Sequence, residues 1–215
     1  HNSTLAALGF STNLLSTARV FFIGFLIGVL MLGLEYLVLG MSAGLVKFVT
    51  VIPNNISIAS YIGYYCYYFF GVLIWNSFIE ELACRAYPIE ALRKHLNPHI
   101  IFSIMGVVFT LGHFIVREFD IAYAIDLFIT SYALSGIYYY SGSIWLAIGV
   151  HTGINWFGFS FSGGIENWKL GALVRIEIQD IPTAIYYATG PIIGIAVFLL
   201  VRLAHKKGLF EKNRK

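Results

Sequence analysis

The side chains best suited to chemistry are two carboxylates, an arginine, two histidines and an amide, all within apolar stretches of the chain. They are Glu80, Glu81, Arg85, His113, His151 and Asn155. A carboxylate and an imidazole can together deprotonate a water, and an imidazole with an amide can donate to a developing oxyanion. These groups would make a hydrolase that acts on a carbonyl. The same set would also serve a proton relay or an ion path.

Two spacings within this set are those of one helical turn. Glu81 and Arg85 are four residues apart, which predicts an ion pair on one helix face. His151 and Asn155 have the same spacing, so a helix would present both side chains toward one neighbour.

The composition determines the class of protein that holds these groups. Of the 215 residues, 58% are hydrophobic and 12% are charged, with a net charge of +3. Soluble domains carry about 25% charged residues, so a soluble enzyme and a nucleic-acid-binding domain are excluded. Cys66 and Cys84 form neither a disulfide framework nor a zinc-ligand spacing. The sequence predicts an all-α, polytopic, integral membrane protein.

About six transmembrane helices are expected, because crossing a bilayer takes roughly 20 apolar residues. The apolar windows are Val20–Gly40, Ile58–Ile79, Ile100–Val116, Ile121–Tyr140, Ile144–Phe161 and Thr183–Leu203. They form one membrane domain over residues 1–215, with an intramembrane site cavity. Small-residue pairs, Gly24/Gly28, Gly149/Gly153 and Gly190/Gly194, indicate close helix packing.

The basic residues predict the orientation of the chain. With both termini in the cytoplasm, ten of the 14 Lys and Arg residues, Arg85 among them, fall on the cytoplasmic side. Outside the windows, Met41–Ser57 is expected to turn at Pro53, Asn54 and Asn55. Leu173–Ile181 alternates apolar and polar residues, which suggests a short strand that could grip a substrate, or an interfacial loop.

The depths of the polar groups depend on the helix boundaries. Glu80 and His113 each lie roughly 22 Å from the turn near His95–Pro98, at 1.5 Å per residue. They share one level if the second helix continues through Arg93. His151 would lie roughly 12 Å in, and therefore shallower.

Three motifs in order resemble a known family. Glu80–Arg85 fits EExxxR, Phe109–His113 fits FxxxH, and His151–Asn155 fits HxxxN. The chain resembles the CAAX protease and bacteriocin-processing family of intramembrane proteases, which includes type II prenyl endopeptidases, over a core at residues 61–159. Ala86 departs from the family, which usually has glycine after the arginine.

The resemblance implies an intramembrane endopeptidase without a covalent intermediate. Glu80 and His113 would activate the attacking water, and His151 and Asn155 would stabilise the oxyanion. Arg85 would hold Glu81 and orient the motif helix. The implied substrate is a prenylated CAAX-type tail or another membrane-associated peptide. No cofactor is expected, although zinc held by His113, His151 and a glutamate is chemically possible.

Other interpretations stay open for the same residues. His113 could be a packed helix histidine, and His151 with Asn155 could be interhelical hydrogen-bonding partners. Glu35 and Asp126 match no motif and could line a cavity or be bonded structurally. The whole chain could be a non-catalytic scaffold or bacteriocin-immunity protein of the same fold, with a partner in the membrane or cell envelope.

Overall fold

The chain folds into a helix bundle capped at one end by a small sheet. The computed structural model describes residues 6–10, 13–50, 56–161 and 174–210. The helices are α2 (Leu14–Ser42), a composite helix over Ile58–Leu92, α6 (Pro98–His113), α7 (Ile121–Ser141), α8 (Ile144–Phe161) and α9 (Thr183–Lys206). The strands are β1 (Leu45–Thr50) and β2 (Val174–Gln179). The predicted all-α membrane class is confirmed.

Five of the six apolar windows are helical throughout, and the third, Ile100–Val116, is helical only as far as His113, where α6 ends. Four of the helices are long and apolar enough to cross a membrane: α2, the composite helix, α7 and α9. Helix α6 is a shorter apolar helix of 16 residues. Helix α8 contacts α2, the composite helix and α7, and most of its first ten residues are buried. The number of passes therefore stays a prediction.

Local sequence signals set the helix ends. Asn13, Ser57 and Asp120 each accept a hydrogen bond from a backbone N–H of the first turn that follows them. Asn97 does the same before α6, where Pro98 takes a first-turn position that needs no N–H donor. Gly142 ends α7 with φ 66, a left-handed conformation that favours glycine.

The closest helix contact is between α2 and α8, and it depends on glycine. A methyl group added at Gly28 would lie 2.0 Å from the carbonyl oxygen of Val150, and one added at Gly153 would lie 2.2 Å from that of Phe25. The backbones can therefore meet only where these side chains are absent. The predicted packing role of the small-residue pairs is confirmed here.

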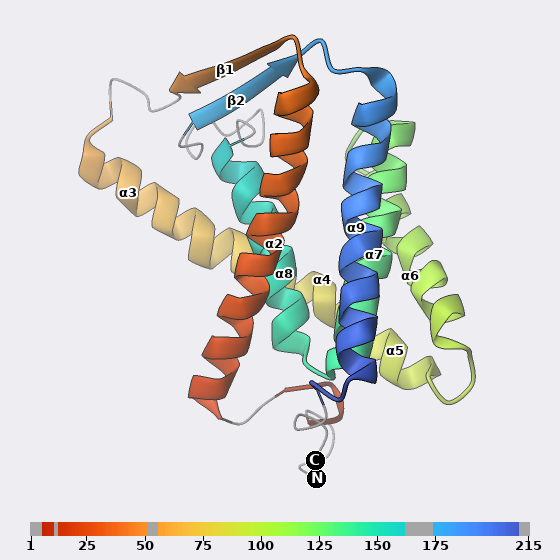
Figure 1. The fold of residues 1–215 in the computed structure, drawn as a ribbon. Coiled ribbons are helices and arrows are strands. Elements are labelled where there is room, and N and C mark those ends of the chain that lie inside the picture. The colour runs from red at the N-terminus through yellow and green to blue at the C-terminus, as the bar shows by residue number, and fades with distance from the viewer. Residues whose placement is uncertain (1–5, 11–12, 51–55, 162–173, 211–215) are drawn as a thin grey trace.

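The two ends of the bundle differ, and we name them by what they carry. At the terminus end, α2 begins and α9 ends (Figure 1). At the sheet end, β1 and β2 pair antiparallel, with Val46 opposite Ile178. The strand expected within Leu173–Ile181 is confirmed, and the interfacial loop is wrong. Its partner β1 was not expected, and Pro53–Asn55 lie outside the described residues.

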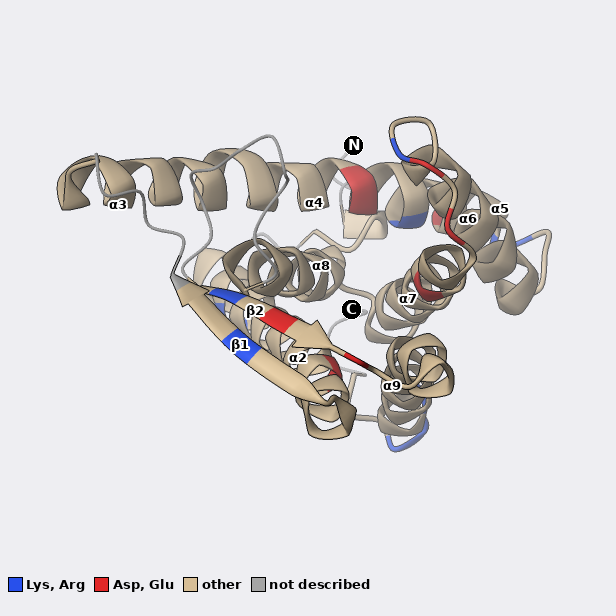
Figure 2. Cartoon of the chain, turned by 90° about the horizontal axis from the view of Figure 1, so that it is seen from above, with Lys and Arg blue, Asp and Glu red and all other residues tan. Residues whose placement is uncertain are grey.

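The prediction that Arg85 lies on the cytoplasmic side is wrong. Arg85 is fully buried inside the bundle, where it pairs with Glu81, so it does not belong among the cytoplasmic charges. The reason is that its helix continues well beyond Ile79, as far as Leu92. Seen from the sheet end, this composite helix runs along one side of the group formed by α2, α7, α8 and α9 (Figure 2).

Candidate active site

The composite helix carries the first motif on a segment with wider turns. It consists of α3 (Ile58–Tyr67), η1 (Tyr68–Ile74), α4 (Trp75–Glu81), η2 (Leu82–Ala86) and α5 (Tyr87–Leu92), and η1 and η2 are π-helical. Pro88 follows η2 and has no N–H for an ordinary helical bond. The helix nevertheless continues through it, and π turns in helices often occur at functional sites.

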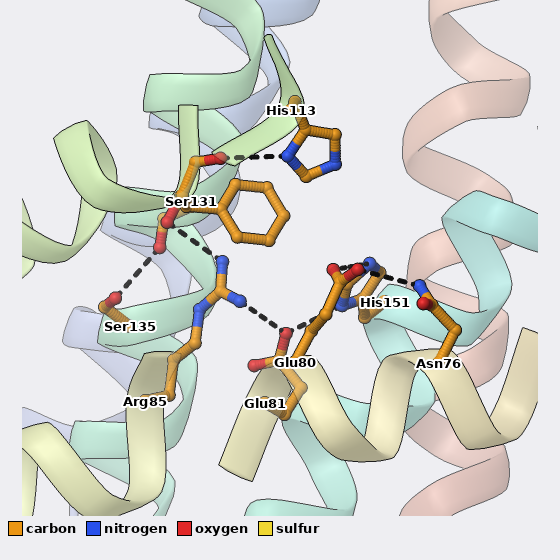
Figure 3. Close-up of polar contacts among 9 residues, drawn as sticks. Asn76, Glu80, Glu81, Arg85, His113, Ser131, Ser135 and His151 are labelled. Carbon is orange, nitrogen blue, oxygen red and sulfur yellow. Dashed lines mark hydrogen bonds and ion pairs between the residues drawn. The ribbon is translucent and has the colours of Figure 1, made fainter. Parts of the chain in front are cut away.

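Glu81 and Arg85 form the predicted ion pair in the interior. Nη1 of Arg85 lies 2.9 Å from Oε1 of Glu81, and both side chains are fully buried. Nη2 of Arg85 donates to Oγ of Ser131 on α7, also at 2.9 Å (Figure 3). The guanidinium carbon lies 4.2 Å from the centre of the Phe109 ring on α6. One arginine thus ties together three helices.

The same carboxylate oxygen orients His151 on α8. Nδ1 of His151 lies 2.7 Å from Oε1 of Glu81, and because a carboxylate accepts, Nδ1 is the donor. Because Nδ1 is occupied by Glu81, Nε2 is the ring nitrogen of His151 that can exchange a proton or contact a substrate. Nε2 lies 3.6 Å from Oε2 of Glu80.

Glu80 is held from two sides and its side chain is partly exposed, although its Oε2 atom is buried and accepts no hydrogen bond. Nδ2 of Asn76 donates to Oε1 of Glu80 at 2.9 Å, while Oε2 faces His151. The Glu80 side chain is 27% exposed, whereas that of Glu81 is fully buried. A gap of 3.6 Å is longer than a hydrogen bond, so Glu80 and His151 are close neighbours without a direct bond. A small side-chain movement would bring them into hydrogen-bond contact.

His113 lies apart from this pair. Its Nδ1 is 2.9 Å from the carbonyl oxygen of Phe109, which can only accept, so Nδ1 is the donor in this hydrogen bond. The Phe109 ring lies 4.5 Å from the His113 ring and 6.0 Å from the His151 ring, centre to centre. Among the described contacts, none joins His113 to Glu80.

The relative depths differ from those expected. His151 was expected to be shallower than Glu80, and this is wrong, because His151 contacts both Glu80 and Glu81. The composite helix crosses the bundle obliquely and meets α8 at α4 (Figure 1). Asn155 follows His151 by one turn of α8 and is half-buried. No hydrogen bond of Asn155 is found within the described part of the chain.

Comparison with known families finds a match over the segment that carries the three motifs. Residues 62–157 match the family model described as type II CAAX prenyl endopeptidase Rce1-like. This segment is similar to the CAAX prenyl endopeptidases. It contains all three motifs and covers just under half of the chain. Searches of curated proteins and of solved structures returned no match.

Ala86 stands where the family usually has glycine, and the structure shows an ordinary helical environment at this position. Ala86 is fully buried and has φ −60 and ψ −53, an ordinary right-handed helical conformation. The backbone therefore does not require glycine at this position. A methyl group fills the space there.

The donor set does not form a metal site. Within the described ranges, no three His, Cys, Asp or Glu side chains are grouped closely enough to hold a metal ion. Glu80 and His151 lie together, but the His113 ring is separated from them, and Nδ1 of His151 already contacts Glu81. We derive no step through zinc.

Glu35 and Asp126 meet elsewhere, beside α9. A methyl group added at Gly190 would lie 2.3 Å from Oδ1 of Asp126 and 3.2 Å from Oε1 of Glu35. The absence of a side chain at Gly190 therefore makes room for the two carboxyl groups of α2 and α7. Within the described part of the chain, neither carboxyl group forms a hydrogen bond or an ion pair with a motif residue, and neither takes a role in the site.

Two residues of the site were not expected from the sequence. Asn76 lies one turn before Glu80 in an apolar helix, and this spacing was a signal that could have identified it. Ser131 lies 46 residues from Arg85 and became apparent only once α7 was placed.

Proposed function

We propose that the chain is an intramembrane endopeptidase that cuts a membrane-associated peptide by direct attack of water. The observation that carries the proposal is the series Arg85–Glu81–His151–Glu80, whose last member is partly exposed and keeps one buried carboxylate oxygen, Oε2, without a hydrogen bond. The match to the prenyl endopeptidase family supports the reaction class.

In this proposal Glu80 is the general base. Asn76 occupies its Oε1, whereas Oε2 is buried and makes no hydrogen bond. In the proposal, Oε2 takes the proton from a water that enters beside it. His113 presents an unbonded Nε2 and would act as a second acceptor for the same water. Reaching that water requires substrate binding to bring α4 and the end of α6 together, since catalytic hydrogen bonds often tighten only in the complex.

In the proposal, side chains of α8 stabilise the oxyanion and protonate the leaving group. Nε2 of His151, once it carries a proton, can donate to the tetrahedral oxyanion, and Asn155 one turn away supplies a neutral amide donor. His151 can then give that proton to the departing amine. The bond from Glu81 stabilises the charged imidazole, and the buried arginine in turn fixes Glu81.

The test is cleavage by the purified chain in lipid nanodiscs, using a library of fluorogenic lipid-anchored peptides. Glu80→Gln should lower kcat by about 10²–10⁴-fold, the typical contribution of a general base. Glu90→Gln is the matched control, because Glu90 lies on the same composite helix and pairs with Arg93. Equal rates for Glu80→Gln and the parent would disprove the mechanism. A parent that cleaves no peptide, yet functions in cells with Glu80→Gln, would favour the non-catalytic scaffold.

A further inference from the structure

The site is closed toward the terminus end of the bundle by its tightest packing. All the hydrophobic side chains that are at most 1% exposed belong to the last part of the composite helix, the start of α6, the end of α7 and the first part of α8. They are Ala86, Ile89, Ile101, Phe102, Ala133, Leu134, Ile137, Ile144, Ala147, Ile148 and Val150. These helix segments lie at the terminus end (Figure 1). Among the described residues, the terminus end is therefore the most tightly packed part of the bundle.

Several motif residues are less buried than the core at the terminus end. In the composite helix, Arg85 and Glu81 are fully buried, Glu80 is partly exposed and Asn76 is exposed. In α8, residues 146–153 are buried, residues 154–158, which include Asn155, are half-buried, and Phe159 and Ser160 are buried again. His113 is the last residue of α6 and is half-buried, at the end that leads toward the sheet. The partly exposed motif groups therefore lie on the sheet side of the tightly packed core.

The described charges orient the two ends in a membrane. The terminus end carries Arg19, Arg93, Lys94, Arg202, Lys206 and Lys207. The sheet end carries only Lys47, Arg117 and Arg175 among the described residues, and these stand beside Glu118, Asp120, Glu177 and Asp180 (Figure 2). Lys and Arg accumulate on the cytoplasmic side of membrane proteins. The terminus end is therefore the cytoplasmic one, even without the buried Arg85.

We infer that the peptidase site opens to the side of the membrane away from the cytoplasm. Its substrate is then an exported, membrane-anchored peptide whose scissile bond reaches the site from the outer leaflet, rather than the lipidated tail of a cytoplasmic protein. This inference rests on the proposed function for the reaction itself. Its claim about sidedness rests on packing and charge alone.

The first experiment compares the two faces of the membrane. The full chain is placed in a bacterial inner membrane, and spheroplasts and inside-out vesicles receive the same membrane-impermeant fluorogenic peptide. Spheroplasts should cleave it, and inside-out vesicles should cleave it only after detergent is added. Cleavage by intact inside-out vesicles alone would overturn the inference, while the proposed function would stand. No cleavage even in detergent would count against the proposed function instead.

A second experiment tests sidedness without any activity. In a Cys66→Ser, Cys84→Ser background, single cysteines are introduced as Glu118→Cys at the sheet end, Lys94→Cys at the terminus end and Asn76→Cys beside Glu80. An impermeant maleimide added to spheroplasts should label Glu118→Cys and Asn76→Cys but not Lys94→Cys. Labelling of Lys94→Cys alone, or of Asn76→Cys only from the cytoplasmic face, would refute the inference.

Discussion

Replacing Arg85 with methionine should reveal how strongly the buried ion pair stabilises the bundle. The pair is fully buried on both sides, and Arg85 also binds Ser131 and covers the ring of Phe109. Removing one partner leaves the Glu81 charge buried without its arginine, which costs about 3–5 kcal/mol in comparable cases. For a domain of this size, 1 kcal/mol shifts the midpoint by about 2–4 °C, so Arg85→Met should lower Tm on the order of 10 °C.

The assay is thermal unfolding of the purified chain in detergent, followed by circular dichroism. Arg93→Met is the matched control, because the Arg93–Glu90 pair is 36% and 22% exposed and such pairs contribute about 0–1 kcal/mol. The double variant Glu81→Leu/Arg85→Met removes both charges and should recover most of the lost stability. It should remain inactive, because His151 has then lost its partner. An Arg85→Met variant as stable as the parent would refute the buried-charge reasoning.

Two further predictions concern packing and positioning. Gly153→Ala should destabilise the bundle by about 1–3 kcal/mol, because the added methyl group meets the backbone of α2. Gly63→Ala is the control: an added methyl group there has nothing within 4 Å, so this variant should stabilise the bundle by about 0.5–1 kcal/mol. Equal Tm shifts for the two variants would contradict this reasoning. Asn76→Leu should lower kcat by about 10- to 100-fold at unchanged KM and Tm, since a hydrogen bond to a charged group contributes about 1.5–3 kcal/mol. Asn76→Gln should restore most of the rate, and failure of that rescue would argue against positioning.

Contacts that depend only on spacing along a helix could be predicted from the sequence. The Glu81–Arg85 pair follows from a spacing of one turn, and the packing of α2 on α8 follows from paired glycines. The strand β2 was visible in its alternation. Its partner β1 contains Val46, Val49 and Thr50, which favour strands, but the nearby Pro53 drew attention to a turn instead.

The contact of Glu80 with His151 could not be predicted in the same way. It depends on the angle at which the composite helix crosses α8, and that angle is set by packing between segments some 70 residues apart. Counting residues from a turn assumes helices perpendicular to the membrane, so it placed His151 at the wrong level. The role of Asn155 and the approach of His113 depend on the bound substrate and stay predictions.

A double-mutant cycle on Glu80 and His151 tests the central claim most directly. In nanodiscs, kcat/KM would be measured for Glu80→Gln, for His151→Gln and for the double variant against one cleaved peptide. If the two side chains act as one unit across their 3.6 Å contact, the double variant should be no slower than the slower single variant. A double variant whose loss equals the product of the two single losses would show that they act independently, and would contradict the account.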